Sequence, residues 1–253
     1  MIQLKLFINK TIEQNAALYF EKAKKSKKKL QGALRALETT KIKLLQQEKS
    51  KVKTPVIKAT RTKKWYDSFR WFVSSEGFLC VGGRDATTNE ILIKKHTESN
   101  DIVFHTKIEG SPFFVIKAEG KKPGKASLEE TAQATASYSR AWRLGLSGVE
   151  VFYVTPDQLS KQAPTGEYIG KGAFTISGKM NLMFAAVQIA VGITKDQIIG
   201  GPVNAIKKNA DKYTLLKQGK GKTTAIGKKI QRQIGGDLDE IIRFIPAGGA
   251  DLL

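Results

Sequence analysis

The first sixty residues combine a narrow apolar stripe with a long run that lacks proline. Apolar side chains recur at spacings of three, four or seven, at Ile12, Ala16, Tyr19, Ala23, Leu30, Leu34, Leu37 and Leu44. Such a stripe is narrower than the face of a core helix and is typical of a coiled-coil seam. Asn9 or Thr11 can cap the helix, and the first proline is Pro55. We predict one coiled-coil helix over residues 1–60.

This predicted seam needs a partner, because a long helix that buries little surface has little to stabilise it. Two of its positions are polar, namely Ser26 (or Lys27) and Lys41. No second stretch of matching length and pattern occurs in the sequence. Either two copies of the chain pair through the seam, or the partner helix belongs to sequence outside this chain.

From residue 61 the pattern changes to short apolar runs separated by turn-forming residues. Residues 69–73, 78–82, 91–93, 113–116, 149–154 and 174–176, with Phe104, are predicted as strands. Ser127 and Glu130 form a capping-box pattern that opens a predicted helix, which extends to Leu144 and ends at Gly145 and Gly148. We predict an α+β fold in which residues 61–181 form a mixed α/β domain.

Residues 182–253 are predicted to form a small C-terminal α/β extension, because glycines break their apolar runs. Helices are expected near residues 222–234 and 237–244, and residues 246–250 are expected to be loop-like. A second basic concentration extends from Lys207 to Arg232, with nine Lys and Arg against Asp211 alone.

The distribution of charged residues indicates which partners the protein binds. The chain has 43 Lys and Arg against 23 Asp and Glu, a net charge of +20. Residues 10–64 hold 17 Lys and Arg against 4 Glu. The run Lys22, Lys24, Lys25, Lys27, Lys28 and Lys29 is either a solvated helix face or a contact for polyanions. The excess of positive charge favours nucleic acid first and an anionic membrane surface second.

The remaining features indicate a protein of the cytoplasm that acts without a membrane. No apolar run approaches the roughly 18–20 residues that span a bilayer, and the N-terminus lacks the pattern of a signal peptide. The only cysteine, Cys80, excludes an intramolecular disulfide and is predicted to be a buried strand residue.

Catalytic signatures are weak throughout, so we predict a protein that is not an enzyme and has neither metal nor cofactor. Residues 219–224, Gly-Lys-Gly-Lys-Thr-Thr, lack the first glycine of a phosphate loop, and residues 120–125 fail the same pattern. Both are expected to be mobile basic loops. The two histidines, His96 and His105, lack zinc-site spacing. His105 is expected at a strand end, making a structural hydrogen bond.

A series of short blocks runs through residues 64–181 in a characteristic order. The blocks are residues 64–72, Gly82-Gly83-Arg84-Asp85, Asn89-Glu90, Lys94-Lys95, Asp101 with His105 and Gly110, and residues 139–142, 156–161, 163–167, 171–174 and 178–181. Together they resemble the NFACT-R domain of the NFACT family. Residues 15–25 resemble the returning coiled-coil arm of that family, and residues from 182 onward resemble the extension of its archaeal-type members.

This resemblance implies a function at the ribosome. NFACT proteins bind the large ribosomal subunit with a stalled nascent chain, together with tRNA, so the expected partners are large-subunit rRNA and tRNA. The family's NFACT-N and helix-hairpin-helix domains are not visible in this sequence, which accounts for the unpaired seam. Because C-terminal tailing in the family depends on NFACT-N, we expect this chain not to drive tailing alone.

Candidate site residues follow from the charge pattern and the blocks. The predicted RNA contacts are Lys24, Lys25, Lys28, Arg84, Lys94, Lys95, Arg140, Lys161, Lys171 and Lys179. The residues expected to be structural are Asp85, Asn89, Asp101, His105 and Trp142. Trp71 or Tyr168 can stack on an unpaired base, unless the tryptophans lie in the core.

Two other classes of function stay open at this point. The chain can be a protein-interaction or adhesion module that uses the coiled-coil seam as its contact. It can also be an enzyme acting on nucleic acid, although the sequence offers neither a metal site nor a clear acid–base pair.

Overall fold

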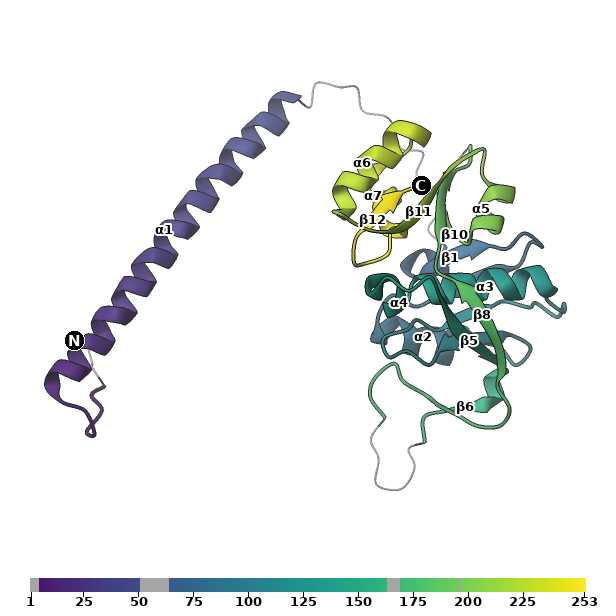
Figure 1. The fold of residues 1–253 in the computed structure, drawn as a ribbon, viewed down its shortest axis with the longest axis horizontal. Helices are drawn as coiled ribbons and strands as arrows, with labels where there is room; N and C mark the ends of the chain where they lie inside the picture. Colours follow the sequence, from purple (N-terminus) through teal and green to yellow (C-terminus); the bar gives the residue numbers. More distant parts are fainter. Residues whose placement is uncertain (1–4, 51–63, 163–168, 196) are drawn as a thin grey trace. The chain divides into compact units, whose positions relative to one another are not determined.

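The computed structural model describes residues 5–50, 64–162, 169–195 and 197–253 (Figure 1). The chain consists of two units, Met1–Arg61 and Thr62–Leu253. None of the helices among the described residues is long and apolar enough to cross a membrane.

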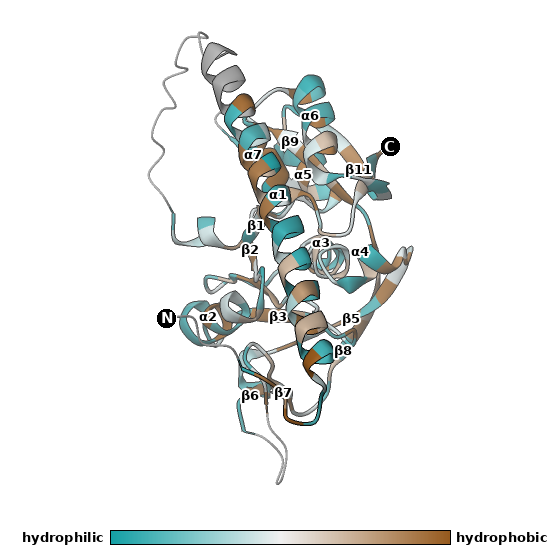
Figure 2. Cartoon of the chain, turned by 90° about the vertical axis from the view of Figure 1, so that its left-hand side faces the viewer, coloured by the Kyte–Doolittle hydropathy of each residue, from teal (hydrophilic) through white to brown (hydrophobic). Residues whose placement is uncertain are grey.

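The first unit is built on helix α1 (Ile12–Ser50), so the prediction of one long helix is confirmed, but residues 5–11 of the predicted range 1–60 precede the helix. Of the two candidate caps, Thr11 caps it: its Oγ1 accepts a hydrogen bond from Gln14 N at 3.3 Å, and Gln14 Oε1 accepts one from Thr11 N at 3.1 Å. Apolar residues recur along α1 (Figure 2), and Leu30, Leu34 and Leu37 are 61%, 57% and 67% exposed. The predicted seam is therefore uncovered within its own unit.

The second unit contains two antiparallel sheets. Among the described residues, the first sheet has six strands in the order β1-β2-β4-β3-β5-β8. These strands are β1 (Arg70–Val73), β2 (Leu79–Gly82), β3 (Ile102–Thr106), β4 (Phe114–Ile116), β5 (Gly148–Val154) and β8 (Asn181–Ala186). Helix α3 (Lys125–Ser137) packs on one face, where Cys80, Phe104 and Phe114 point, and Leu92 of α2 (Ala86–His96) packs on the other, with Val81 and Val103. The alternation of side chains along each strand separates the two faces.

The second sheet and its helices come from the C-terminal residues. In the part of the chain that the structure describes, its four strands follow the order β10-β9-β11-β12. They are β9 (Ile189–Ile193), β10 (Ile198–Gly201), β11 (Lys212–Gly221) and β12 (Ala250–Leu252). Helices α5 (Val203–Asn209), α6 (Thr223–Ile234) and α7 (Leu238–Phe244) pack against these strands. The two helices predicted near residues 222–234 and 237–244 are thereby confirmed.

Short elements complete the second unit. They are the 3₁₀ helices η1 (Trp65–Ser68) and η2 (Pro156–Gln158), helix α4 (Arg140–Leu144), and the two-stranded ladder of β6 (Leu159–Ser160) with β7 (Thr175–Ile176). The ladder lies on either side of residues 163–168, which are outside the described residues.

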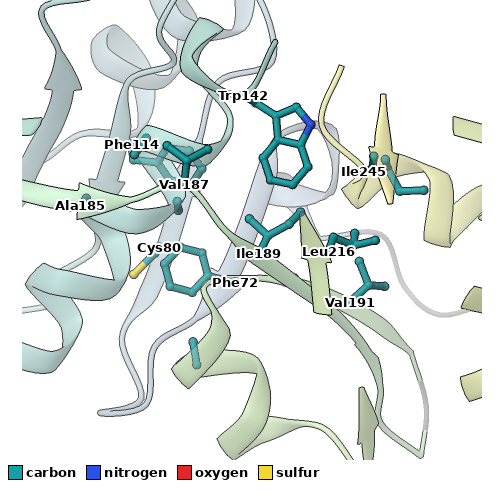
Figure 3. Packing of buried hydrophobic residues seen from close by; sticks show 14 of the residues in the cluster. Phe72, Cys80, Phe114, Trp142, Ala185, Val187, Ile189, Val191, Leu216 and Ile245 are labelled. Atoms are coloured by element: carbon teal, nitrogen blue, oxygen red, sulfur yellow. The ribbon is translucent and has the colours of Figure 1, made fainter. Parts of the chain in front are cut away.

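One buried core extends through both sheets. Figure 3 shows Phe72 and Phe114 of the first sheet in the same cluster as Ile189 and Leu216 of the second, with the Trp142 indole beside them. Two long-range hydrogen bonds reinforce this core: Trp142 Nε1 donates to Gly249 O at 2.7 Å, and Tyr138 OH donates to Phe244 O at 2.9 Å. The predicted boundary after residue 181 falls at the start of β8, and the residues on its two sides share this core.

The strand predicted at residues 91–93 is wrong, because these residues lie in α2. Three consecutive β-branched or branched residues look like a short strand, but the N-cap at Asp85 begins a helix that carries them. Leu92 is buried and the isoleucines on either side are partly buried, as on the inner face of a helix.

The single helix predicted from Ser127 to Leu144 is two helices, α3 and α4, and its capping box does not exist. Gly124 is the N-cap of α3, and Glu130 accepts a hydrogen bond from Ser75 N at 2.8 Å instead. Ser139 interrupts the helix by capping α4 through Ala141 N at 3.1 Å. The predicted end at Gly145 is correct, since this residue adopts φ 73°.

Two segments predicted as loops belong to the second sheet. Residues 219–221 lie in β11, and Ala250 begins β12, where it is buried. Gly219 is required because a Cβ there would overlap the side chain of Asp251 on the neighbouring strand. Cys80, by contrast, is a buried strand residue as predicted, and burial raises the pKa of its thiol to about 12.

Candidate nucleic-acid interface

A tight turn after β2 fixes the position of Arg84. Gly83 has no room for a side chain, because a Cβ there would overlap Asn89, whose Oδ1 accepts Phe113 N at 3.2 Å. Asp85 caps α2 by accepting Thr88 N at 2.8 Å. Thr88 Oγ1 in turn accepts Arg84 N at 2.8 Å. Asp85 and Asn89 therefore hold the turn through local hydrogen bonds, and the Arg84 side chain is left exposed.

Three arginines and one tyrosine gather beside this turn. The Arg70 guanidinium lies over the Tyr138 ring at 4.6 Å from its centroid, and Arg70 Nη1 donates to Gly83 O at 3.3 Å. Burial lowers the pKa of Arg84, and the nearby charges of Arg243 and Arg70 lower it further. Burial also lowers the pKa of Arg70 and raises the pKa of Tyr138 to about 12. Arg70, Arg84 and Arg243, here called the arginine cluster, thus lie close enough for their like charges to matter, with Arg70 partly buried and Arg84 and Arg243 exposed.

A pocket of about 520 Å³ opens next to the arginine cluster. The turn at residues 83–86, residues 107–113 after β3, and residues 171–174 form its walls, together with Arg70 and Tyr138. Pockets of this size hold small organic ligands. Its walls come from segments far apart in the chain, joined by the first sheet and by the tether described next.

Glu90 of α2 tethers the wall formed by residues 171–174. Its Oε2 accepts Gly172 N at 2.9 Å and lies 3.2 Å from Lys161 Nζ, while its Oε1 lies 2.7 Å from Lys94 Nζ. The Lys94 hydrogen bond, followed by those from Gly172 and Lys161, lowers the pKa of Glu90 to about 2. Lys161 also donates to Gly170 O at 3.1 Å and lies over the Phe174 ring. The ammonium of Lys161 is therefore engaged inside the protein.

The other predicted RNA contacts divide between the two units. Lys171 lines the pocket, and Arg140 lies beside Gly110 at its edge. Lys95 and Lys179 are exposed but do not line the pocket. Lys24, Lys25 and Lys28 are exposed on α1, in the first unit.

The residues expected to be structural are engaged in internal contacts. Asp101 is 1% exposed; it accepts Ala118 N at 2.9 Å and pairs with the ammonium of Lys117. The Nε2 of His105 lies 3.2 Å from Ser111 O, and its ring stacks on Phe113 with centroids 4.3 Å apart. Burial lowers the pKa of His105.

Reasoning from the sequence missed the most distinctive part of this site. Arg70, Tyr138 and Arg243 come from β1, the C-cap of α3 and α7, so no local motif joins them. One signal was available: Arg70 is a lone charge among Phe69, Trp71 and Phe72. A charge in an apolar strand marks either an edge or a functional position.

Of the two predicted stacking residues, the structure describes only Trp71. Trp71 is buried in the core against Tyr66 and Phe244, and Tyr168 lies outside the described residues. Over the described residues, no group of three His, Cys, Asp or Glu is placed to hold a metal ion. The pocket lining combines the cations Arg70, Arg84, Lys107 and Lys171 with the carboxylates Asp85 and Glu109 and with apolar side chains.

Comparisons with known proteins identify relatives of this chain. Residues 68–178 match the family model described as the NFACT protein RNA binding domain. The chain is 40% identical over 204 residues to "Archaeal Rqc2 homolog aRqcH" of Methanocaldococcus jannaschii, covering 78% of this chain and 30% of that protein. It is 34% identical over 174 residues to "Ribosome quality control complex subunit NEMF" of Homo sapiens, covering 67% of this chain and 16% of that protein.

Among solved structures, the C-terminal part of the fibronectin/fibrinogen-binding protein from Streptococcus suis aligns with a TM-score of 0.41 and 19% identity. That alignment covers 71% of this chain and 77% of that one, and the likeness is weak. The chain spans less than a third of the length of each curated relative named above. The match over residues 68–178 and the two relatives together show that this chain belongs to the NFACT family.

Proposed function

We propose that this chain is the RNA-binding module of a ribosome-associated quality-control factor in the cytoplasm. The observation that carries the proposal is the match of residues 68–178 to the NFACT protein RNA binding domain. The relatives whose names refer to ribosome quality control supply the context. The module binds rRNA of the large subunit, tRNA or both, without catalysing a reaction, and does not drive C-terminal tailing by itself.

The charge of the protein supports this proposal on physical grounds. A net charge of +20 draws the chain to polyanions, and neutralisation of phosphates releases counterions, so affinity falls steeply as salt increases. The lysines of α1 and the basic residues around the pocket supply these contacts. RNA recognition relies on shape and on unpaired bases, which suits a surface that combines exposed cations with a concave site.

The exposed seam of α1 favours a second candidate function, binding to a protein helix. Leu30, Leu34 and Leu37 form an apolar line that its own unit does not cover. Such a line pairs with another helix by coiled-coil packing. Its partner is either a second copy of the chain or a helix of sequence outside it. This pairing is compatible with RNA binding, since the seam and the lysines use different side chains.

Sedimentation with purified ribosomal subunits tests the proposal. The tagged chain is mixed with large subunits, small subunits or intact ribosomes at salt concentrations from about 50 to 300 mM. We expect selective co-sedimentation with large subunits that weakens as salt increases. Equal binding to every RNA would reduce the protein to a generic polyanion binder. Absence of binding at the lowest salt would contradict the proposal and favour the helix-pairing function.

A further inference from the structure

The arginine cluster contains a buried donor that the protein does not satisfy. The Nε of Arg70 is buried, yet it has no hydrogen-bond partner among the described residues. An unsatisfied buried donor costs free energy, and more so when it belongs to a charged group. Arg70 also lines the pocket, so its guanidinium group adjoins a ligand placed there.

The electrostatics of the cluster call for an anion. Arg84 lies close enough to Arg70 and Arg243 for their charges to disfavour its own. Within the part of the chain that the structure describes, neither Arg70 nor Arg84 takes part in an ion pair. Asp85, the acid beside them, is committed to capping α2 through Thr88 N. A phosphate between the guanidinium groups relieves the repulsion and accepts charge-assisted hydrogen bonds.

The pocket lining also contains apolar side chains. Phe113 and Phe174 meet edge to face with centroids 5.6 Å apart, and Pro112 and Ile176 line the wall with them. Aromatic and aliphatic side chains give a nucleic-acid base a surface to pack against. The pocket thus combines cationic and apolar lining residues within about 520 Å³, which are the two kinds of contact that a single nucleotide uses.

We propose that this pocket binds one unpaired nucleotide of an RNA strand, with its phosphate on Arg70 and Arg84 and its base toward Phe174. The inference rests on the proposed RNA-binding function and assigns one site and one ligand class to it. A duplex cannot enter a concave site of this size, so the pocket selects a nucleotide that is unstacked in a loop, bulge or strand end. The tether from Glu90 to Gly172 holds the apolar wall in place for this ligand.

Titration calorimetry of the full chain at constant salt tests this proposal, with adenosine monophosphate, adenosine and inorganic phosphate as probes. We expect the monophosphate to bind more tightly than adenosine or inorganic phosphate. Two substitutions at exposed positions should each weaken its binding about tenfold or more: Arg84→Met, which removes a phosphate contact, and Ala173→Trp, which fills the pocket mouth without changing charge. Arg232→Met removes the same charge from the exposed side of α6 and should change binding less than twofold.

Competition separates a free nucleotide from a nucleotide within RNA. A single-stranded RNA hexamer should compete with adenosine monophosphate in the wild-type protein and lose affinity in Ala173→Trp. The proposal is overturned if the monophosphate does not bind, if Ala173→Trp and Arg84→Met bind it as the wild type does, or if the hexamer does not compete. Arg70→Lys gives an additional check, since it keeps the charge but lacks Nε, and it should weaken binding when circular dichroism shows an intact fold.

The large-subunit sedimentation experiment distinguishes failure of this inference from failure of the proposed function. If wild type and Ala173→Trp co-sediment equally and the nucleotide probes do not bind, the pocket assignment fails while ribosome binding stands. If the wild type does not co-sediment at low salt, the proposed function itself fails.

Discussion

Helix α1 and the compact unit of residues 62–253 use charged residues in opposite ways. On α1, Lys22, Lys24, Lys25, Lys27, Lys28 and Lys29 are all exposed. In the compact unit, Lys117 is 8% exposed and pairs with a buried aspartate, and Arg70 is held over an aromatic ring. Because these six lysines of α1 are all exposed, we expect charge on the helix to act by number, with interchangeable members. In the compact unit it acts by position, which depends on packing.

The largest effect is expected from a substitution in the core of the compact unit, which should leave α1 unchanged. Trp142→Ala should lower the free energy of unfolding of residues 62–253 by about 3–5 kcal/mol, because it leaves a cavity and an unpaired Gly249 carbonyl. Thermal unfolding followed by tryptophan fluorescence measures this loss. Trp65→Ala is the matched control, since Trp65 is 42% exposed and should cost far less. Equal losses would refute the role of the shared core.

The next largest effect is expected from the buried ion pair of Asp101 and Lys117. Asp101→Asn should destabilise the compact unit by about 3 kcal/mol or somewhat more, because it removes the buried carboxylate that pairs with the Lys117 ammonium and leaves only the exposed Glu98 near it. Glu98→Gln removes the other carboxylate near Lys117, at 3.3 Å, but Glu98 is exposed and its loss should be small. Urea unfolding of both variants provides the comparison. Similar losses of stability in the two variants would show that burial of the carboxylate beside Lys117 does not matter.

A smaller effect tests interchangeability on the helix. The triple substitution Lys24→Gln, Lys25→Gln and Lys28→Gln should reduce the slope of log affinity for RNA against log salt by about 2–3. Substituting Lys22, Lys27 and Lys29 instead should give the same reduction, because all six lysines are exposed. Fluorescence anisotropy with a labelled RNA over a salt series measures both. A clear difference between the salt slopes of the two triple variants would mean that the position of each lysine on α1 also matters.

The smallest effect is a pH dependence confined to the compact unit. Burial lowers the pKa of His105, so the unfolded chain, with an ordinary pKa of about 6.5, binds the proton more tightly than the folded one. Stability should therefore fall as pH drops below about 6.5, by at most about 1.4 kcal/mol per pH unit. His105→Gln should flatten this part of the stability profile.

The control for this prediction is His96→Gln, which removes the only other histidine. Burial also lowers the pKa of His96, but the ring is partly exposed and stacks on Trp65, so its contribution should be smaller. A profile that is unchanged in His105→Gln would contradict the assignment. The circular dichroism of α1, which contains no histidine, should not follow this pH dependence.

The same contrast explains what the sequence could predict. The extent of α1 follows from a repeating seam and the absence of proline, both of which are local. The strands at residues 69–73, 78–82 and 149–154 follow from apolar runs between turns, although β1 and β2 begin one residue later than predicted and β5 begins one residue earlier. The strand predicted at residues 91–93 is wrong because these residues belong to a helix that begins after the N-cap at Asp85. The capping box predicted at Ser127 and Glu130 is wrong because both side chains bond to residues far away in the sequence. Ser127 bonds to Ser74, and Glu130 accepts a hydrogen bond from Ser75 N.

The candidate site was predictable only in its local part. The glycine turn before Arg84, with Asp85 and Asn89 around it, is encoded within a few residues. The arginine cluster was not predictable, because Arg70 and Arg243 are brought together by the two-sheet core. For Lys161 the sequence was misleading. The local sequence suggests an exposed cation that is free to contact RNA, but in the fold its ammonium pairs with Glu90 and lies over the Phe174 ring.

The closing of the second sheet by β12 has a consequence for how the protein is made. β11 cannot pair with β12, and the Trp142 indole cannot reach Gly249, until residues 249–252 have left the ribosome. Contacts over such sequence separations form slowly. Helix α1 needs no such closure, because its hydrogen bonds are local. During synthesis, the local hydrogen bonds of α1 can therefore form before β12 is available to complete the second sheet.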